Sequence, residues 1–288
     1  MEYRALEGFV FSLTPFNFTS IASNLNMAPA MMGNVAVWNR LLRRSIRTIS
    51  LMRFPKRPAC RWRSELHPGT GSVIGKVITG SVIWRGSILR LYLYVQYFVA
   101  SDRRELGHYK SYPKIVGETG GKNFIFAHPS APALDVATAI VRGAFEYQGQ
   151  KCSAGSRAYI PASLWKEVKD YVGDMLKEIK MGDVQDFTNF VNAVIDEASF
   201  DNIMSYIDYA KQSPDAEVLF GGNGDKSVGY FVEPTVIQTT DPMFKSMVEE
   251  IFGPVITIYV YDDAKYEETL ELCDRTSPYG LTGSIFRP

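Results

Sequence analysis

From residue 113 onward, short apolar runs alternate with amphipathic stretches, and only short turns join them. This alternation is the sequence pattern of strands and helices that follow one another in an α/β domain. It constrains the fold of the chain more than any other feature does. We therefore predict an α/β fold over this part of the sequence.

The spacing of apolar residues predicts the individual elements. Apolar positions within 164–179 recur at helical spacing, with Ser163 as the predicted N-cap and Gly182 after the last turn. A second amphipathic helix is predicted over 200–210. The remaining predicted elements are a helix at 264–274 and strands at 230–236, 254–261 and about 282–286.

The N-terminal part begins with the same pattern. The apolar run 9–13 predicts a strand, the small residues of 20–33 predict a helix that ends at Gly33, and 35–38 predicts a buried strand. After Trp38 the alternation stops, and it resumes only near residue 67.

Composition narrows the class of protein. A hydrophobic content of 46% with 22% charged residues is typical of a globular protein long enough to bury a sizeable core. Three cysteines and three scattered histidines make no disulfide framework and show no metal-ligand spacing. We therefore expect no metal site.

Basic residues are concentrated in the first hundred positions, where thirteen Lys and Arg stand against three Asp and Glu. Segment 39–63 alone holds eight Arg, one Lys and no acid. One interpretation of this segment is a patch that binds nucleic acid or a membrane surface. The other is that these residues do not belong to the fold around them.

The most membrane-like stretch is 81–100, and Arg85, Arg90 and Gln96 lie inside it. An arginine near the centre of a bilayer costs about 2.5–3.5 kcal/mol on insertion scales, so we do not expect a spanning helix here. The chain opens without an uninterrupted apolar run, and we expect no signal peptide.

Cys152 is the first candidate for chemistry. It follows Gly149 and precedes Gly155, which allow close approach of the backbone, and Lys151 adds positive charge beside it. A nucleophilic thiolate needs such an electropositive, accessible setting. The alternative is an inert, buried cysteine, which is the commoner role of a single cysteine.

Three other segments hold candidates. Glu118 lies between glycines, where it is either a turn residue or a carboxylate free to act as a general base. Asn17 carries a neutral amide that suits an oxyanion, or it caps the helix that follows. Glu249 and Glu250 open the run EEIFGP, whose simpler interpretation is a loop before a strand.

Together, in this order and spacing, these segments resemble the NAD(P)-dependent aldehyde dehydrogenase superfamily. The resemblance covers about 1–38 and 101–288. It is closest to the branch that oxidises L-glutamate γ-semialdehyde. The phrases that carry it are LEGFVFSLTPFNFTSI, YPKIVGETGGKNFIF, FEYQGQKCSAGSR, SVGYFVEPTVI and EEIFGPVITIYVY.

The resemblance implies a role for each candidate. Cys152 matches the nucleophile that attacks the aldehyde carbon, Asn17 with the Cys152 backbone N–H matches the oxyanion hole, and Glu118 matches the base that activates water for hydrolysis of the thioester. Glu250 matches the carboxylate that holds the nicotinamide ribose, and Phe252 packs beside that ring. The other implied site residues are Thr14 and Trp38 at the cofactor cleft, and Phe18 and Ser153 at the substrate pocket.

The implied fold is aldehyde dehydrogenase-like. It combines a partial, damaged Rossmann-type NAD-binding domain over 1–118 with an α/β catalytic domain over 119–288, which carries the thiol and whose residues 250–288 return toward the cofactor cleft. NAD is the implied cofactor and a small-molecule aldehyde the implied substrate. The family assembles as homo-oligomers, and neither nucleic acid nor a membrane is an expected partner. The resemblance also implies the mitochondrial matrix, although no targeting segment is visible in this chain.

Two segments depart from the family pattern. After Trp38 the family has a lysine that contacts the cofactor ribose, where this chain has Asn39, and 82–100 lack the family's glycine-serine turn at the pyrophosphate. Both segments have nearly the length that the family has there, but their composition and pattern do not match the family. We therefore interpret 39–66 and 82–100 as sequence from a shifted reading frame. The basic segment 39–63 is then no nucleic-acid patch, and weak binding of NAD+ is expected. The family also has more sequence before residue 1 and after Pro288.

The predicted reaction is NAD-dependent oxidation of L-glutamate γ-semialdehyde to L-glutamate in proline catabolism, through a cysteine thiohemiacetal and a thioester. Two alternatives remain open: an aldehyde dehydrogenase of another specificity, and a catalytically dead fragment of one.

Overall fold

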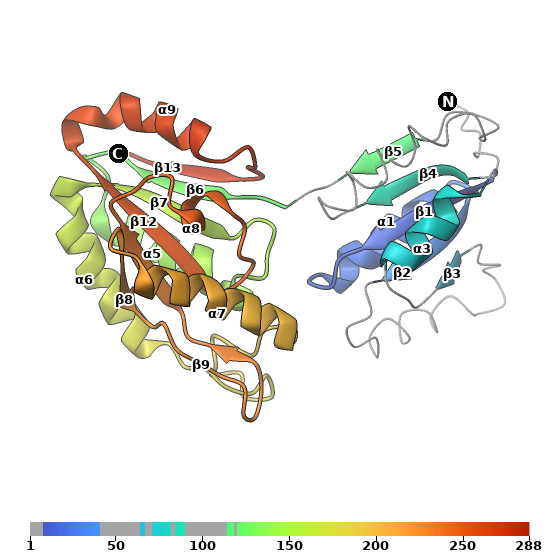
Figure 1. Ribbon diagram of the computed structural model, residues 1–288, viewed down its shortest axis with the longest axis horizontal. Coiled ribbons are helices and arrows are strands. Elements are labelled where there is room, and N and C mark those ends of the chain that lie inside the picture. Colours follow the sequence, from blue (N-terminus) through green and yellow to red (C-terminus); the bar gives the residue numbers. More distant parts are fainter. Residues whose placement is uncertain are drawn as a thin grey trace. The chain divides into compact units, whose positions relative to one another are not determined.

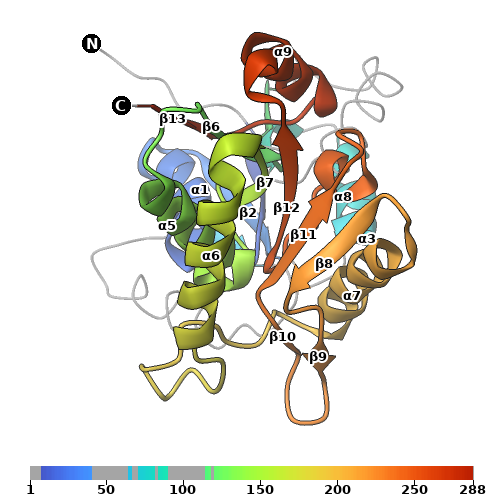
Figure 2. The ribbon, with the colours of Figure 1, turned by 90° about the vertical axis from the view of Figure 1, so that its left-hand side faces the viewer.

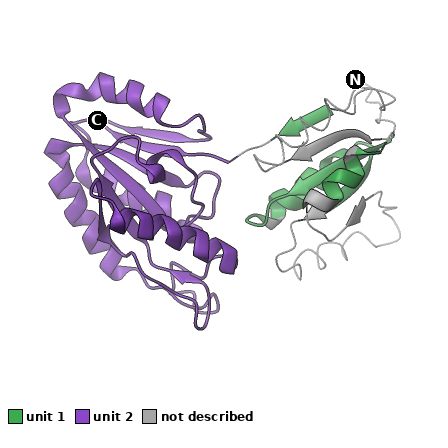
Figure 3. Ribbon diagram, in the orientation of Figure 1, with its two compact units in different colours: residues 1–119 green, residues 120–288 purple. Residues whose placement is uncertain are grey.

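The computed structural model describes residues 8–40, 64–66, 71–81, 84–89, 114–117 and 120–287. The chain divides into two compact units, Met1–Thr119 and Gly120–Pro288 (Figures 1 and 3). Each unit is built around its own sheet. The roles expected for the domains 1–118 and 119–288, and the return of 250–288 toward a cofactor cleft, stay predictions.

A five-stranded parallel sheet forms the first unit, in the order β3-β2-β1-β4-β5. Its strands are β1 (Phe9–Thr14), β2 (Val35–Arg40), β3 (Ser64–Leu66), β4 (Trp84–Leu89) and β5 (Lys114–Gly117). This is the order of the first five strands of a Rossmann-type sheet, in which strand succession reverses beside the first strand. The expected α/β fold is confirmed.

β1 lies at the centre of this sheet and is apolar along its length. Phe11 and Leu13 are buried and pack with Ile78 of helix α3 (Gly71–Thr79). Helix α1 (Thr19–Met31) follows β1, and its N-cap residue is Phe18, without a side-chain capping bond. The alternative that Asn17 caps this helix is therefore wrong.

Parts of the two departing segments contribute strands to the sheet. β3 pairs with β2, and β4 lies between β1 and β5. The apolar stretch 81–100 thus contains a β-strand. Most of 39–66 and of 82–100 lies outside the described residues, and their origin in a shifted reading frame stays a prediction. Among the helices that the structure describes, none is long and apolar enough to cross a membrane.

A six-stranded sheet forms the second unit, in the order β13-β6-β7-β12-β11-β8 (Figure 2). Its strands are β6 (Asn123–Ala127), β7 (Gly155–Pro161), β8 (Ala216–Phe220), β11 (Thr235–Thr239), β12 (Val255–Tyr261) and β13 (Gly283–Phe286). All neighbouring strands are parallel except β8, which runs antiparallel to β11. A short antiparallel ribbon, β9 (Gly224–Asp225) and β10 (Phe231–Val232), accompanies the sheet.

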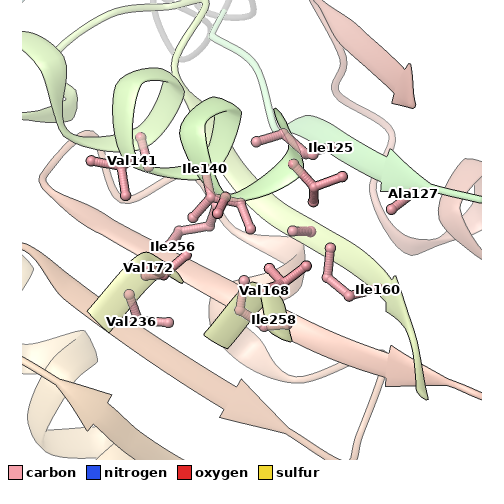
Figure 4. Close-up of a cluster of buried hydrophobic side chains, with 14 of the residues drawn as sticks. Ile125, Ala127, Ile140, Val141, Ile160, Val168, Val172, Val236, Ile256 and Ile258 are labelled. Atoms are coloured by element: carbon pink, nitrogen blue, oxygen red, sulfur yellow. The ribbon is translucent and has the colours of Figure 1, made fainter. Parts of the chain in front are cut away.

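Helices cover both faces of this sheet because its strands are apolar on both sides. Along β6, Ile125 and Ala127 join the core under α5 (Ala133–Phe145) and α6 (Ala162–Glu178), which Figure 4 shows. Phe126 points to the other face and joins the core of α7 (Glu197–Gln212), α8 (Lys245–Val248) and α9 (Tyr266–Thr276). The unit therefore has two hydrophobic cores, one on each side of the sheet.

The predicted helices at 200–210 and 264–274 and the strands at 254–261 and 282–286 are all present, within a few residues. Two predictions are wrong in detail. Helix α6 begins at Ala162, so Ser163 lies in its first turn and its backbone N–H donates to Asp263 Oδ1 (3.1 Å). The predicted strand at 230–236 is divided between β10 and β11, because Pro234 has no N–H to donate to a neighbouring strand.

Candidate active site

Cys152 lies in a tight turn between the end of α5 and the start of β7. The backbone N–H of Ala154 donates to the carbonyl of Lys151 (3.1 Å), which places Cys152 at the second position of a four-residue turn. Cys152 is partly exposed, whereas Cys273 on α9 is only 3% exposed. Of the two cysteines that the structure describes, Cys152 is the accessible one; Cys60 lies outside the described residues.

The backbone that leads into this turn is strained. Tyr147, Gln148 and Gly149 have successive φ angles of 58°, 56° and 63°. Residues other than glycine rarely adopt this left-handed conformation. A Cβ on Gly149 would lie 2.1 Å from the carbonyl oxygen of Gly253, so only glycine fits there. Backbone strain of this kind is concentrated at functional sites in proteins.

The charge next to the sulfur differs from the sequence interpretation. The Lys151 ammonium donates to Glu146 Oε2 (2.6 Å), and an Arg142 guanidinium nitrogen lies 3.3 Å from Glu146 Oε1. The hydrogen bond from Lys151 lowers the pKa of the Glu146 carboxyl. Because this lysine is ion-paired, it gives Cys152 no free positive charge, and that part of the interpretation is corrected.

The loop between α8 and β12 holds two adjacent carboxylates with different partners. Glu249 accepts a hydrogen bond from the Tyr206 hydroxyl (2.6 Å), whereas Glu250 Oε1 accepts one from the backbone N–H of Gly121 (2.9 Å). A Cβ on Gly120 would lie 2.1 Å from Glu250 Oε2, so this carboxylate occupies the space that a side chain at 120 would need. The structure thus singles out Glu250 as the carboxylate beside the glycine pair.

Partial loss of hydration raises the pKa of Glu250, and the Gly121 N–H and the Lys122 ammonium oppose that rise. Phe252, two residues further, has a φ of 61°, which is unusual for a bulky side chain. Backbone strain therefore occurs in both loops that the sequence predicted to be functional.

Asn123 joins the cysteine turn to the end of the unit. Its Nδ2 donates to the carbonyls of Cys152 (2.7 Å) and Ala154 (2.8 Å), and its Oδ1 accepts from the N–H groups of Leu281 (3.0 Å) and Thr282 (2.8 Å). The Thr282 hydroxyl also donates to the carbonyl of Ser153 (3.3 Å).

Lys122, between Gly121 and Asn123 in the sequence, is 0% exposed, and its Nζ has no hydrogen-bond partner. The buried Arg157 donates from Nε to the Lys122 carbonyl (3.0 Å). Loss of hydration, together with the nearby Arg157 charge, lowers the pKa of Lys122 to about 7, while Glu250 and Glu249 act in the opposite direction. Sequence reasoning missed both Lys122 and Asn123.

In the first unit, Trp38 Nε1 donates to Thr14 Oγ1 (2.9 Å), and both side chains are buried. Thr14 is the last residue of β1, and Asn17 and Phe18 belong to the connection between β1 and α1. In doubly wound sheets, ligands bind outside the carboxyl ends of the strands, beside the point where strand order reverses. This is the edge at which Thr14 lies.

The structure therefore places the predicted site residues in two groups. Thr14 and Trp38 contact each other in the first unit, and the Cys152 turn meets the Glu250 loop through the glycine pair in the second. Glu118 lies outside the described residues. Among the residues that are described, no group of three or more His, Cys, Asp or Glu side chains could hold a metal ion.

The chain is similar to proteins of one family. The aldehyde dehydrogenase family model matches residues 103–287. The mitochondrial delta-1-pyrroline-5-carboxylate dehydrogenases of Dictyostelium discoideum and Homo sapiens are 49% and 42% identical over 306 and 291 residues, which cover 99% of this chain and 52% and 51% of those proteins. The crystal structure of the delta-pyrroline-5-carboxylate dehydrogenase from Mycobacterium tuberculosis bound with NAD has a TM-score of 0.90 at 38% identity, over 99% of this chain and 52% of that one.

The chain thus spans about half the length of the curated relatives it matches. The matched region includes the Cys152 turn, the glycine pair and the Glu250 loop. Because the family model matches more than half of the chain, this chain belongs to the aldehyde dehydrogenase family.

Proposed function

We propose that this chain takes part in NAD-dependent oxidation of L-glutamate γ-semialdehyde to L-glutamate, the reaction of the branch that its sequence phrases resemble. One observation carries the proposal: the accessible Cys152 lies at the corner of a turn, and a glycine pair joins this turn to the loop of Glu250. A Cβ on Gly121 would lie 3.1 Å from the Cys152 carbonyl, and its N–H binds Glu250. The residue that carries the nucleophile and a carboxylate that suits ribose hydroxyls thus both contact the same glycine pair, 120–121.

The proposed chemistry begins at Cys152. Its thiolate attacks the aldehyde carbon, so that a C–S bond forms and negative charge develops on the former carbonyl oxygen. The Cys152 backbone N–H and the Asn17 amide are proposed to stabilise that oxyanion. Loss of a hydride turns the thiohemiacetal into a thioester. Glu118 is proposed to take a proton from the water that cleaves the thioester, which releases glutamate and the free thiol.

Each unit holds residues that suit part of a dinucleotide, although Asn39 stands where the family has the lysine that contacts the ribose. Glu250 keeps its carboxylate against the glycine pair, and Thr14 and Trp38 lie toward the carboxyl ends of strands in a Rossmann-ordered sheet. Glu250 would hold the nicotinamide ribose, Phe252 would pack beside the ring, and Phe18 and Ser153 would line the substrate pocket. When bound, NAD+ supplies the hydride acceptor. The relative from Mycobacterium tuberculosis is a complex with NAD, which supports this cofactor.

The proposed location is the mitochondrial matrix, and the proposed assembly is a homo-oligomer. The names of several relatives include the word mitochondrial, which supports the location. Subcellular fractionation would test the location, and light scattering of the purified chain would test the assembly.

Incubation of the purified chain with NAD+ and Δ1-pyrroline-5-carboxylate, which hydrolyses to the semialdehyde, tests the proposal directly. We expect absorbance of NADH, glutamate identified by mass spectrometry, and loss of both in Cys152→Ser. Faster turnover of simple aliphatic aldehydes would favour another specificity. An inactive chain whose Cys152 turn is intact would favour the dead-fragment alternative.

Replacement of Glu118 tests the role of the base. In Glu118→Gln, thioester formation should persist while hydrolysis slows by roughly 10²-fold or more, since the water loses its base. Stopped-flow absorbance should then show a burst of NADH followed by a slow steady state. Loss of the burst itself would place Glu118 in the first half-reaction instead.

A further inference from the structure

The hydrogen bonds of Asn123 have a pattern that only an amide can make. The side chain is 2% exposed at the start of β6, and its two N–H groups donate to two carbonyls of the cysteine turn. Its oxygen accepts from the N–H groups of Leu281 and Thr282. An amide has two donors and two acceptor positions, and all four are used here. A carboxylate has no donor, and a hydroxyl has only one.

The neighbouring glycine is part of the same junction. A Cβ on Gly121 would lie 2.9 Å from Asn123 Oδ1, 3.1 Å from the Cys152 carbonyl oxygen and 3.3 Å from the Leu281 Cβ. The absence of a side chain at 121 lets three segments meet: the start of β6, the cysteine turn and residues 281–282. Their hydrogen-bonding residues lie 29 to 159 positions apart in the sequence.

We propose that Asn123 is a positioning residue for the nucleophile. It holds the carbonyls of Cys152 and of Ala154 in fixed directions and anchors them to residues 281–282. Because these bonds fix the direction of the Cys152 carbonyl, they hold the ψ angle of Cys152 and with it the direction in which its Cα–Cβ bond leaves the turn. The proposal rests on the proposed function only in taking Cys152 as the reactive residue.

The turn is closed by a bond from the Ala154 N–H to the Lys151 carbonyl, and the approach through 147–149 is strained. The ammonium of Lys151, at the first position of the turn, pairs with Glu146. The second half of the turn is instead bound from outside, by Asn123 at two carbonyls and by the Thr282 hydroxyl at the Ser153 carbonyl.

Two variants at this position separate positioning from general stability. Asn123→Asp keeps the size and the acceptor for 281–282 but turns an oxygen toward the two carbonyls. Asn123→Ser removes the amide without adding charge and is the milder change. Thr239→Val, on β11, is the matched control, because the buried Thr239 hydroxyl has two carbonyl oxygens within hydrogen-bond distance, those of Asp215 (2.8 Å) and Asp241 (3.2 Å).

Three measurements apply to each purified variant: its urea midpoint, hydrogen exchange of the peptides that contain 151–155 and 281–283, and the pH profile of Cys152 alkylation by iodoacetamide. In both Asn123 variants, exchange of the peptide that contains 151–155 should rise by roughly tenfold or more, the equivalent of two lost hydrogen bonds. In Asn123→Ser, which loses the amide acceptor for Leu281 and Thr282, exchange of the peptide that contains 281–283 should rise as well. In Asn123→Asp the alkylation profile should also move to higher pH, since a carboxylate disfavours a nearby thiolate. Thr239→Val should lower the urea midpoint and leave exchange at 151–155 and the alkylation profile unchanged.

The proposal is overturned if both Asn123 variants lower the urea midpoint as the control does but keep the exchange and the alkylation profile of the parent chain. A folded Asn123→Ser keeps the test decisive if Asn123→Asp does not fold. Neither readout uses NAD+ or aldehyde. An inactive parent chain would therefore count against the proposed function and leave the role of Asn123 to be decided by exchange and alkylation.

Discussion

Lys122 shows how far the environment of a single residue can depart from what its side chain prefers. The ammonium is fully buried beside a second buried cation, Arg157, and its Nζ has no hydrogen-bond partner. Burial of a charge without a hydrogen-bonded partner is costly, and the usual outcome is a shifted pKa. Here the pKa of Lys122 falls from 10.5 to about 7.

This shift predicts a pH dependence of stability. Between the folded pKa of about 7 and the unfolded value of 10.5, the unfolded chain binds more protons than the folded chain. The free energy of unfolding should therefore rise with pH across this window, by up to about 1.4 kcal/mol per pH unit. Hydrogen exchange of the second unit at about pH 7, 8 and 9 would measure it.

Lys122→Met should be more stable than the parent near neutral pH and should lose this rise. Lys166→Met, at an exposed position of α6, should keep it. Parallel pH profiles in the parent and in Lys122→Met would contradict the assignment.

Thiol exposure predicts an order of alkylation. Cys152 is partly exposed, whereas Cys273 is buried and its burial raises the pKa of that thiol. Under limiting iodoacetamide, Cys152 should therefore be alkylated well before Cys273 in the folded chain. Peptide mass spectrometry gives the order, and urea-unfolded protein is the control in which both should react. Equal labelling in the folded state would show that Cys152 is not the accessible thiol.

The sequence indicated those functional residues that lie within a motif formed by their immediate neighbours in the chain. Cys152 and Glu250 lie in recognisable phrases, and the structure places both in strained, glycine-rich loops. The sequence did not indicate Asn123 and Lys122 because the residues that surround them lie far away in the chain. Asn123, for example, is hydrogen-bonded to residues 29 to 159 positions away. The pairing of Lys151 with Glu146 was equally invisible, since it depends on how the turn folds back on α5.

Among the elements, the left-handed turn before Cys152 is the most restrictive. Three successive positive φ angles form it, and Gly149 packs directly on the carbonyl of Gly253. The segment 147–149 that leads into the cysteine turn and the Glu250 loop thus approach each other through backbone at Gly149 and Gly253. No side chain larger than hydrogen fits between them.

Gly149→Ala should therefore be strongly destabilising. A residue with a Cβ costs about 1–2 kcal/mol in the left-handed region, and the 2.1 Å approach to Gly253 adds a clash to this. Urea denaturation should show a clear loss of stability. Gly280→Ala is the control, because a Cβ there meets nothing within 4 Å, and it should be close to neutral. Equal stability of the two variants would mean that the turn relaxes freely.

Element types were predictable from periodicity, whereas some boundaries were not. α7 and β12 came out close to their predicted bounds because their apolar spacing is regular. The start of α6 was missed since Pro161, rather than Ser163, is its N-cap residue. In the first unit the Rossmann order of strands could not be read from the sequence, because β3 and β4 fall in the segments whose pattern breaks.

On the scale of the whole molecule, the second unit has what an independent domain needs. It has a six-stranded sheet, helices on both faces and a buried core on each side, all drawn from residues 120–288. The fragment 120–288 should therefore fold without the rest of the chain. Circular dichroism, a cooperative urea transition and dispersed amide NMR signals would be the expected results. A non-cooperative transition would show that its cores depend on the first unit.

The position of β13 in the sheet also determines when, during synthesis of the chain, the contacts of the cysteine turn can form. This strand is the last of its sheet to be synthesised, yet it pairs with β6, the first. The ribosome therefore releases the cysteine turn long before residues 281–282, the groups that hold the other end of Asn123, have been made. Closing so long a loop costs entropy and makes such contacts late and slow. The thiol thus acquires its final orientation only after residues 281–282 have been synthesised and have left the ribosome.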